Sequence, residues 1–170
     1  LDESSHKHAF AVSEDLKYSV REAVELLGNE AVYYVEWVLH EKIYGKNLEG
    51  QLTLECLRYL YRLLFILYVE ARRELEYAPM NSDEYREGYS LESLRDLALV
   101  HLEADRGKFF LHESVSRLFR LVYEGFHHQP RQGVLDLDGE KQDVHTFRME
   151  PLRAHLFDPA RTPLLNRVKF

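Results

Sequence analysis

The chain has 170 residues, of which 45% are hydrophobic and 30% are charged, and it is rich in Tyr and Phe. This balance excludes a disordered polypeptide, and the length is sufficient for one domain with a substantial core. The formal net charge of −7 excludes a protein whose whole surface coats nucleic acid, because contacts of Lys and Arg with phosphate supply most of that affinity.

The charge is unevenly distributed along the chain. Residues 131–170 carry 7 Lys and Arg against 6 Asp and Glu, whereas residues 1–130 carry 15 against 23. Any contact with DNA is therefore expected in residues 131–170. The single cysteine, Cys56, has no partner for an intrachain disulfide, which favours a reducing, cytoplasmic location. Because the sequence begins without an initiator Met, we expect it to be an excerpt of a longer polypeptide.

Two consecutive helices are predicted in the first third of the chain. Ser13 is expected to cap the first helix, in which residues 16–27 place apolar side chains at helical spacing. Gly28 is expected to end this helix. Asn29 then caps the second helix, which ends at Gly45.

The third predicted helix, residues 51–76, is unusually apolar. In residues 57–69 only Arg58 and Arg62 are charged. This apolar stretch is shorter than the roughly 20 residues that cross a bilayer, so we expect the helix to lie at the centre of a protein core. The residues expected in that core are Leu60, Leu63, Leu64, Leu67 and Tyr68.

Two further helices are predicted after an irregular connector. The connector follows Pro79 and is rich in Asn, Ser, Asp and Gly, and the next helix begins at Ser90. Residues 108–126 form the following helix, with most of its apolar residues on one face. These are Phe110, Val115, Leu118, Phe119, Val122 and Phe126.

The last part of the chain changes character. Residues 134–149 alternate polar and apolar side chains around Asp138-Gly139, a dipeptide that favours a type I′ hairpin turn. The expected fold is therefore mainly α, with a bundle of about five helices around a central apolar helix in residues 1–130. A β-ribbon and turn-rich tail, residues 131–170, follows and leads toward a further domain.

Patterns typical of catalytic or metal sites are scarce. The sequence has no glycine-rich phosphate loop, and the His6/His8 and His127/His128 pairs lack metal-ligand spacing with a carboxylate. Asp138-Gly139 is read as a turn, because the Glu-x-Lys of metal-dependent nucleases is absent. The Arg–His spacing of a family of helical ribonucleases occurs four times against about 2.4 chance matches, so that activity stays an alternative. The four pairs are Arg95/His101, Arg106/His112, Arg120/His127 and Arg148/His155.

Charged residues also decorate the apolar helix and its end, at Arg62, Glu70, Arg72 and Arg73. They can be solvated or paired with side chains one helical turn away, which stabilises a helix by about 0.2–0.5 kcal/mol per pair. Alternatively, they form an ion-pair latch to a neighbouring domain or to DNA.

Three blocks of the sequence carry a family resemblance. They read "LYRLLFILYVEAR" in residues 60–72, "YAPMNSDEYREGYSLESLRDL" in residues 77–97 and "FRMEPLRAHLFDPARTPLLNRV" in residues 147–168. In this order they resemble a region of the large adenine-N6 DNA methyltransferases of bacterial restriction-modification and phage-defence systems, which include combined restriction-methylase polypeptides. In that family the region precedes the catalytic domain.

The resemblance implies a non-catalytic helical scaffold between domains of such an enzyme. The family's S-adenosylmethionine loop and its Asn/Asp-Pro-Pro-Tyr/Phe tetrapeptide are absent, and Phe157-Asp158-Pro159 is the nearest match. We therefore assign no catalytic, cofactor-binding or metal residue to this chain. The parent enzyme would use S-adenosylmethionine and bind double-stranded DNA, without a membrane. An independent helical interaction module or a helical ribonuclease is the alternative.

Basic residues of the tail are the candidates for contact with DNA or with a neighbouring domain. DNA-binding enzymes that flip a base hold the duplex through phosphate contacts. Alternatively, the same side chains face a neighbouring domain or pair with acidic residues of the tail, namely Asp136, Asp143, Glu150 and Asp158. The candidates are Arg131, Arg148, Arg153, Arg161, Arg167 and Lys169.

Overall fold

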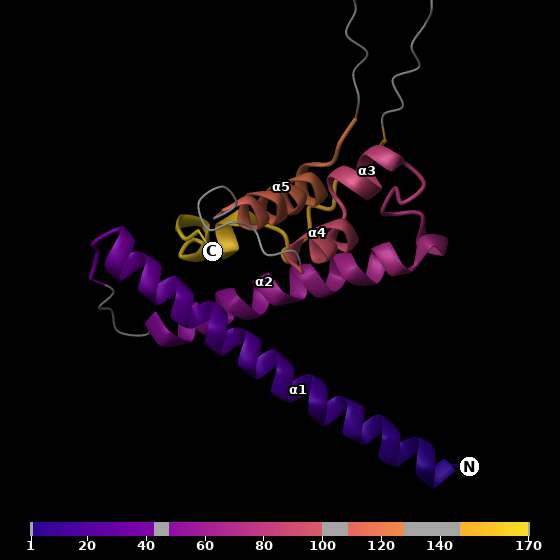
Figure 1. Cartoon of the computed structure of the whole chain (residues 1–170), viewed down its shortest axis with the longest axis horizontal. Helices are drawn as coiled ribbons and strands as arrows, with labels where there is room; N and C mark the ends of the chain where they lie inside the picture. The colour runs from indigo at the N-terminus through magenta and orange to yellow at the C-terminus, as the bar shows by residue number, and fades with distance from the viewer. Residues whose placement is uncertain (1, 43–47, 100–108, 128–146, 170) are drawn as a thin grey trace, which may run out of the picture. The chain divides into compact units, whose positions relative to one another are not determined.

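The structure is a computed structural model that describes residues 2–42, 48–99, 109–127 and 147–169 (Figure 1). The described residues are mainly helical, which confirms the expectation of a mainly α fold. They form two compact units, of which unit 1 comprises residues 1–61 and 159–170 and unit 2 comprises residues 62–158. The hairpin predicted at Asp138-Gly139 lies outside the described residues.

The first helix, α1, runs without interruption from Asp2 to Tyr33 and continues as a π-helical turn, Tyr34–Val38. The prediction of two helices meeting at Gly28 is therefore wrong, and Ser13 and Asn29 lie inside the helix rather than at its caps. The apolar stripe explains the continuity, because it stays in phase on both sides of the glycine. The residues of this stripe are Val24, Leu27, Ala31 and Val35.

Gly28 lies where α1 crosses the N-terminal half of α2, the helix Leu48–Ala71 (Figure 1). A Cβ atom at Gly28 would lie 4.0 Å from both Cys56 Sγ and Leu52 Cδ2. A glycine inside a helix costs about 1 kcal/mol relative to alanine. We infer that burial of the neighbouring apolar stripe against α2 offsets this cost.

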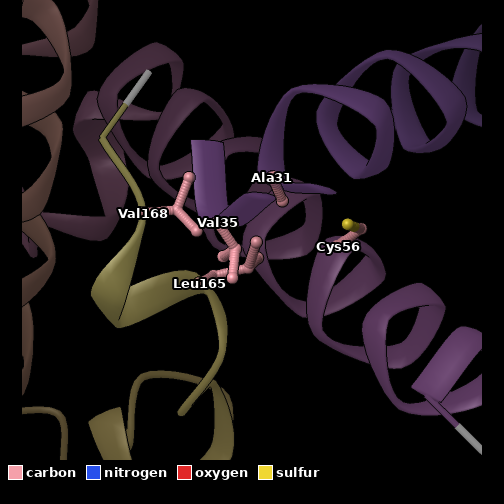
Figure 2. Packing of buried hydrophobic residues seen from close by; sticks show 5 residues of the cluster. All are labelled: Ala31, Val35, Cys56, Leu165 and Val168. Carbon is pink, nitrogen blue, oxygen red and sulfur yellow. The ribbon is translucent and has the colours of Figure 1, made fainter. Parts of the chain in front are cut away.

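The core of unit 1 joins the end of α1 to α2 and to the C-terminal segment. Figure 2 shows Val35 next to Leu165 and Val168, with Ala31 and Cys56 alongside. All five are buried. The C-terminal segment is therefore an integral part of unit 1. It contains two short 3₁₀ turns, Pro159–Arg161 and Leu165–Arg167.

The helix α2 confirms the third predicted helix but ends at Ala71, and a 3₁₀ turn, Arg73–Leu75, follows it. The prediction of which residues of this helix lie in the core is wrong for three of the five. Leu64, Leu67 and Tyr68 are exposed, and Leu60 and Leu63 are only partly buried. The opposite side of α2 is buried. It includes charged residues, which are stabilised there by hydrogen bonds to main-chain groups.

Three shorter helices belong to unit 2: α3 (Asp83–Gly88), α4 (Leu91–Ala98) and α5 (Phe110–Glu124). The connector predicted to be irregular thus contains a helix. The predicted start at Ser90 is confirmed, since its side chain accepts a hydrogen bond from Ser93 N at 3.2 Å and caps α4.

On α5 the predicted core face is confirmed at Leu118, Phe119 and Val122, whereas Phe110 is exposed. Phe110 is the first residue of the helix, where fewer neighbours are available to cover it.

An aromatic cluster fills the core of unit 2 around Phe147. Its ring lies 5.4 Å from that of Tyr85, 5.4 Å from that of Tyr89 and 4.8 Å from that of Phe126, measured between centroids. Phe126 and Met149 also exchange both main-chain hydrogen bonds in an isolated antiparallel bridge. Among the described residues, no helix combines the length and the apolarity needed to cross a membrane.

Candidate functional site

Three charged side chains of α2 are almost completely buried. Glu55 is 1% exposed, Arg62 is 4% exposed and Glu70 is 5% exposed. They follow one another at intervals of about two helical turns, so they lie along one side of the helix. Buried charges are rare in proteins unless they are paired or hydrogen-bonded. The partners of these three side chains therefore indicate what the side chains do.

In unit 1, the Glu55 carboxylate binds the main chain of the C-terminal segment. One oxygen accepts hydrogen bonds from Leu164 N at 2.8 Å and Leu165 N at 3.0 Å, and the other accepts one from Gln51 Nε2 at 2.9 Å. Leu165 begins a 3₁₀ turn, so the carboxylate supplies acceptors for amide groups that have no partner within the turn. Arg58 reaches the same segment and donates to Arg161 O at 3.1 Å.

In unit 2, the Arg62 guanidinium also binds main-chain groups. Its Nε donates to Leu156 O at 2.6 Å, and an Nη donates to Asp158 O at 3.0 Å. The guanidinium carbon lies 5.5 Å from the centre of the Phe119 ring, a geometry in which the positive charge is attracted to the face of the ring. Arg62 thereby fixes the path of the chain around residue 157.

The Glu70 carboxylate holds the start of α4. Its Oε1 accepts hydrogen bonds from Tyr85 Oη at 2.9 Å and Leu91 N at 3.0 Å, and its Oε2 accepts one from Glu92 N at 3.2 Å. A negative charge at a helix N-terminus is favourable because it faces the positive end of the helix dipole. Burial raises the pKa of Glu70 above its usual value, although these three hydrogen bonds act in the opposite direction.

Burial also raises the pKa of two tyrosines in this region. The pKa of Tyr85 is raised mainly by burial and, to a smaller extent, by the negative charge of Glu70. Burial raises the pKa of Tyr77 to about 12. Both hydroxyls therefore remain protonated and act as hydrogen-bond donors, Tyr85 to Glu70 and Tyr77 to Glu150 O at 3.3 Å. The arrangement is suited to holding the backbone in place.

The four charged residues singled out on α2 and at its end fall into two groups, buried and exposed. Arg62 and Glu70 bind groups inside unit 2, so neither is a solvated surface charge. Arg72 and Arg73 are exposed, and Arg72 pairs with Glu74 at 3.1 Å. The sequence analysis did not predict a role for Glu55. Its signal was its position two turns before Arg62, on the side of the helix that also carries the buried Ile66.

The basic residues of the tail are divided between the two units. Arg148 and Arg153 belong to unit 2 and are exposed, and Arg148 pairs with Glu150. In unit 1, an Nη of Arg167 donates to both carboxylate oxygens of Glu41 at 2.6 Å. The partner of Arg148 is one of the acidic residues of the tail that the alternative names, whereas the partner of Arg167 lies outside the tail.

The remaining candidates complete this picture. Arg161 and Lys169 lie in unit 1 and are exposed, whereas Arg131 lies outside the described residues. Exposed ion pairs contribute at most about 1 kcal/mol and exchange readily with other partners. The pairing of Arg148 with Glu150 is therefore compatible with a later contact to phosphate.

Described residues of unit 1 line two adjacent apolar hollows of about 210 and 340 Å³, which share Val32, Leu48 and Leu52. The larger one reaches Cys56. Burial, together with the negative charge of Glu55, raises the pKa of this thiol to about 11, so it is not an activated nucleophile. Among the described residues, no three His, Cys, Asp or Glu side chains gather as metal ligands would.

Comparison of the chain with protein-family models, with curated proteins and with solved structures finds no match. Its function is therefore argued from its own residues and from the three sequence blocks that carry the family resemblance.

Proposed function

We propose that the chain is a non-catalytic helical scaffold between domains of a cytoplasmic, S-adenosylmethionine-dependent adenine-N6 DNA methyltransferase of the restriction-modification type. The proposal is carried by one observation: the hydrogen bonds of Arg62 and Glu70 join the three sequence blocks that resemble this family. Both residues lie in the first block. Glu70 binds residues 85, 91 and 92 of the second, and Arg62 binds residues 156 and 158 of the third.

Aromatic packing in unit 2 supports the same grouping. Phe157 of the third block packs edge-to-face on Phe65 of the first, with ring centroids 5.5 Å apart. Phe147 of the third block packs in the same manner on Tyr85 and Tyr89 of the second. Segments separated in the sequence but joined in one core are expected to form a unit together, which suits a scaffold that holds neighbouring domains.

The cofactor is proposed to bind elsewhere in the parent polypeptide. An S-adenosylmethionine loop of this family needs glycines in a turn that approaches the ligand closely. Gly28 and Gly50 lie inside helices, and Gly88 and Gly125 lie at helix ends. None of these four glycines lies in such a loop, and the other four glycines of the chain lie outside the described residues.

The finer architecture also belongs to this proposal. A five-helix bundle, followed by a hairpin at Asp138-Gly139, would leave the tail next to the downstream domain. The main-chain bridge between Phe126 and Met149 is compatible with a ribbon between these residues.

The activity of the parent polypeptide tests the proposal. Purified residues 1–170 are expected to show neither adenine methylation nor saturable S-adenosylmethionine binding in calorimetry, whereas the full-length parent should show both. An intact chain that binds the cofactor by itself would contradict the scaffold role. A coding sequence without an Asn-Pro-Pro-Tyr-type motif downstream of Phe170 would contradict the assignment to a methyltransferase.

Contact of the tail with double-stranded DNA is a separate part of the proposal. In the parent enzyme, Arg148, Arg153 and Arg161 are changed together to Ala, and the affinity for duplex DNA is measured over a range of salt concentrations. Each lost phosphate contact should reduce the slope of log K against log salt by about one. An unchanged slope in a correctly folded variant would exclude these residues as a DNA-binding surface.

A matched control removes the same positive charge from other exposed positions. The control variant carries Arg21→Ala, Arg95→Ala and Arg120→Ala. Its salt dependence should equal that of the wild type. An equal loss in both variants would indicate a general effect of net charge rather than a contact made by the tail.

The alternative function is an independent helical interaction module, and the exposed apolar residues of the chain favour it over a ribonuclease. Leu64, Leu67 and Tyr68 of α2 form an exposed apolar surface of the kind that partner proteins cover. Of the four Arg–His pairs, those that include His101 and Arg106 lie partly outside the described residues. Purified residues 1–170 that cleave RNA would revive the ribonuclease interpretation.

A further inference from the structure

One face of α1 and of the π-helical turn that continues it combines exposed apolar and acidic side chains. Its residues follow one another at intervals of three, four or seven positions, which places them on a single side of the helix. Leu26 is 63% exposed, Tyr33 is 57% exposed and Trp37 is 68% exposed. We define the acidic-aromatic face by these three residues together with the exposed carboxylates of Asp15, Glu22 and Glu30.

This face is not used in the core of unit 1. The side chains that α1 packs against α2 and the C-terminal segment, including Ala31 and Val35, lie on the other side of the helix. Tyr33 and Trp37 are stacked, with ring centroids 6.3 Å apart and an interplanar angle of 26°. The two rings therefore present one continuous aromatic surface.

The described basic side chains of α1 pair with carboxylates outside this face. The basic residues Lys17 and Arg21 pair with Glu14 at 3.8 Å and with Glu25 at 2.9 Å, on a different side of the helix. In the part of the chain that the structure describes, no ion pair involves the three carboxylates of the acidic-aromatic face. Their negative charge is thus available to a partner.

We propose that the acidic-aromatic face binds a basic amphipathic helix of a partner protein. The apolar side of such a helix would cover Leu26, Tyr33 and Trp37, and its Lys or Arg residues would approach the carboxylates. From Asp15 to Trp37 the face is about 33 Å long, which accommodates about 20 residues of a partner helix. Tyr and Trp are enriched among the residues that dominate binding energy at protein interfaces.

The charge argues against other occupants. A second copy of the chain would place carboxylates opposite carboxylates, which is unfavourable at an interface. Phosphate of nucleic acid and anionic lipid head groups would be repelled for the same reason. The surface lies on α1 and the π-helical turn that follows it, and it does not depend on the proposed methyltransferase context.

Fluorescence of Trp37, the single tryptophan of the chain, provides the test. The whole 170-residue chain is titrated with a tryptophan-free helical peptide that has Leu on one face and Lys on the other. We expect a saturable blue shift of the emission that weakens as salt is added. A peptide with Glu in place of each Lys should bind at least tenfold more weakly.

Variants locate the binding on the helix. Glu22→Gln combined with Glu30→Gln should weaken binding of the Lys peptide at least fivefold. The matched control, Glu14→Gln combined with Glu25→Gln, removes the same charge from another side of α1 and should change the affinity less than twofold. Circular dichroism verifies that both variants keep the helix content of the wild type.

Several results would overturn the proposal. Absence of saturable binding is one, and an equal loss of affinity in the two double variants is another, because it would indicate non-specific attraction. Trp37 emission that is already typical of a buried indole in the free chain would show that the chain itself covers the face. If light scattering shows a dimer, and Trp37 in that dimer has the emission of a buried indole, the face would be assigned to a second copy of the chain.

Discussion

Replacing Glu70 with Ala is expected to destabilise unit 2 by about 3 kcal/mol. The substitution leaves three buried donors without their acceptor: the hydroxyl of Tyr85 and the amides of Leu91 and Glu92. Each such loss costs about 1–3 kcal/mol. The lower end of that range applies, because the variant also avoids the cost of burying a carboxylate, the cost that raises the pKa of Glu70.

This loss is large relative to the stability of a domain, which is typically about 5–15 kcal/mol. For a chain of this size it corresponds to a decrease in Tm of about 6–12 °C. Urea unfolding followed by circular dichroism measures the free energy. Hydrogen exchange locates the effect, and the amides at the start of α4 should lose protection before those of α5.

Two control variants separate the main-chain bonds of Glu70 from a general effect of charge. Glu74→Ala removes an exposed carboxylate that pairs only with Arg72 among the described residues, and it should cost less than about 0.5 kcal/mol. Glu70→Gln keeps an oxygen acceptor and should be less harmful than Glu70→Ala. A loss below about 1 kcal/mol for Glu70→Ala, or a loss of protection spread evenly over α5, would refute the reasoning.

Three further outcomes are expected. Burial raises the pKa of Glu70 above 4.5, so the folded chain binds this proton more tightly than the unfolded chain. In urea titrations, the free energy of unfolding of the wild type relative to Glu70→Gln should therefore fall as the pH rises above about 4.5. Gly125→Ala should cost about 2 kcal/mol or more in thermal unfolding, because φ is +77° and the added Cβ would lie 2.8 Å from Pro151 N, whereas Gly88→Ala meets nothing within 4 Å and should be nearly neutral. Iodoacetamide at about pH 8 should modify Cys56 at least tenfold more slowly in the folded than in the urea-unfolded chain, since the thiol is buried and its pKa is about 11; equal rates would contradict this.

The local signals of the sequence predicted local structure well. The helix start at Ser90 was predicted correctly, and the contact that caps this helix is local, because Ser90 accepts a hydrogen bond from the amide of Ser93, three residues along the chain. The helix in residues 48–71 was recognised because few of its residues are polar. Gly28 was misread for the converse reason: a glycine ends a helix only where the chain benefits from leaving it, and here the apolar stripe continues beyond it.

The orientation of α2 could not be predicted from local signals. Hydrophobicity alone placed Leu64 and Leu67 in the core, whereas the structure exposes both and buries Arg62. The groups that stabilise Arg62 are carbonyl oxygens of Leu156 and Asp158, more than 90 residues away in the sequence. Main-chain partners leave no trace in a pattern of side chains, so neither periodicity nor charge indicated them.

The same limit applies to the basic residues of the tail. Their number and position predicted a candidate surface, but the partner of Arg167 is Glu41, 126 residues earlier in the sequence. An ion pair of this kind is defined by the fold of unit 1. Arg148, by contrast, pairs with Glu150 two residues away, and the sequence did include that residue among the expected partners.

The buried charges of α2 explain how one helix can organise segments that are distant in the sequence. Glu55 and Glu70 accept from amides at the start of helical turns, and Arg62 donates to carbonyl oxygens of an irregular segment. Each residue therefore recognises a backbone conformation rather than a particular side chain. Replacing a buried charge by an apolar residue of similar size can preserve stability in some proteins. Here it would leave several main-chain groups unpaired at once, so the charge defines the path of the chain as well as its stability.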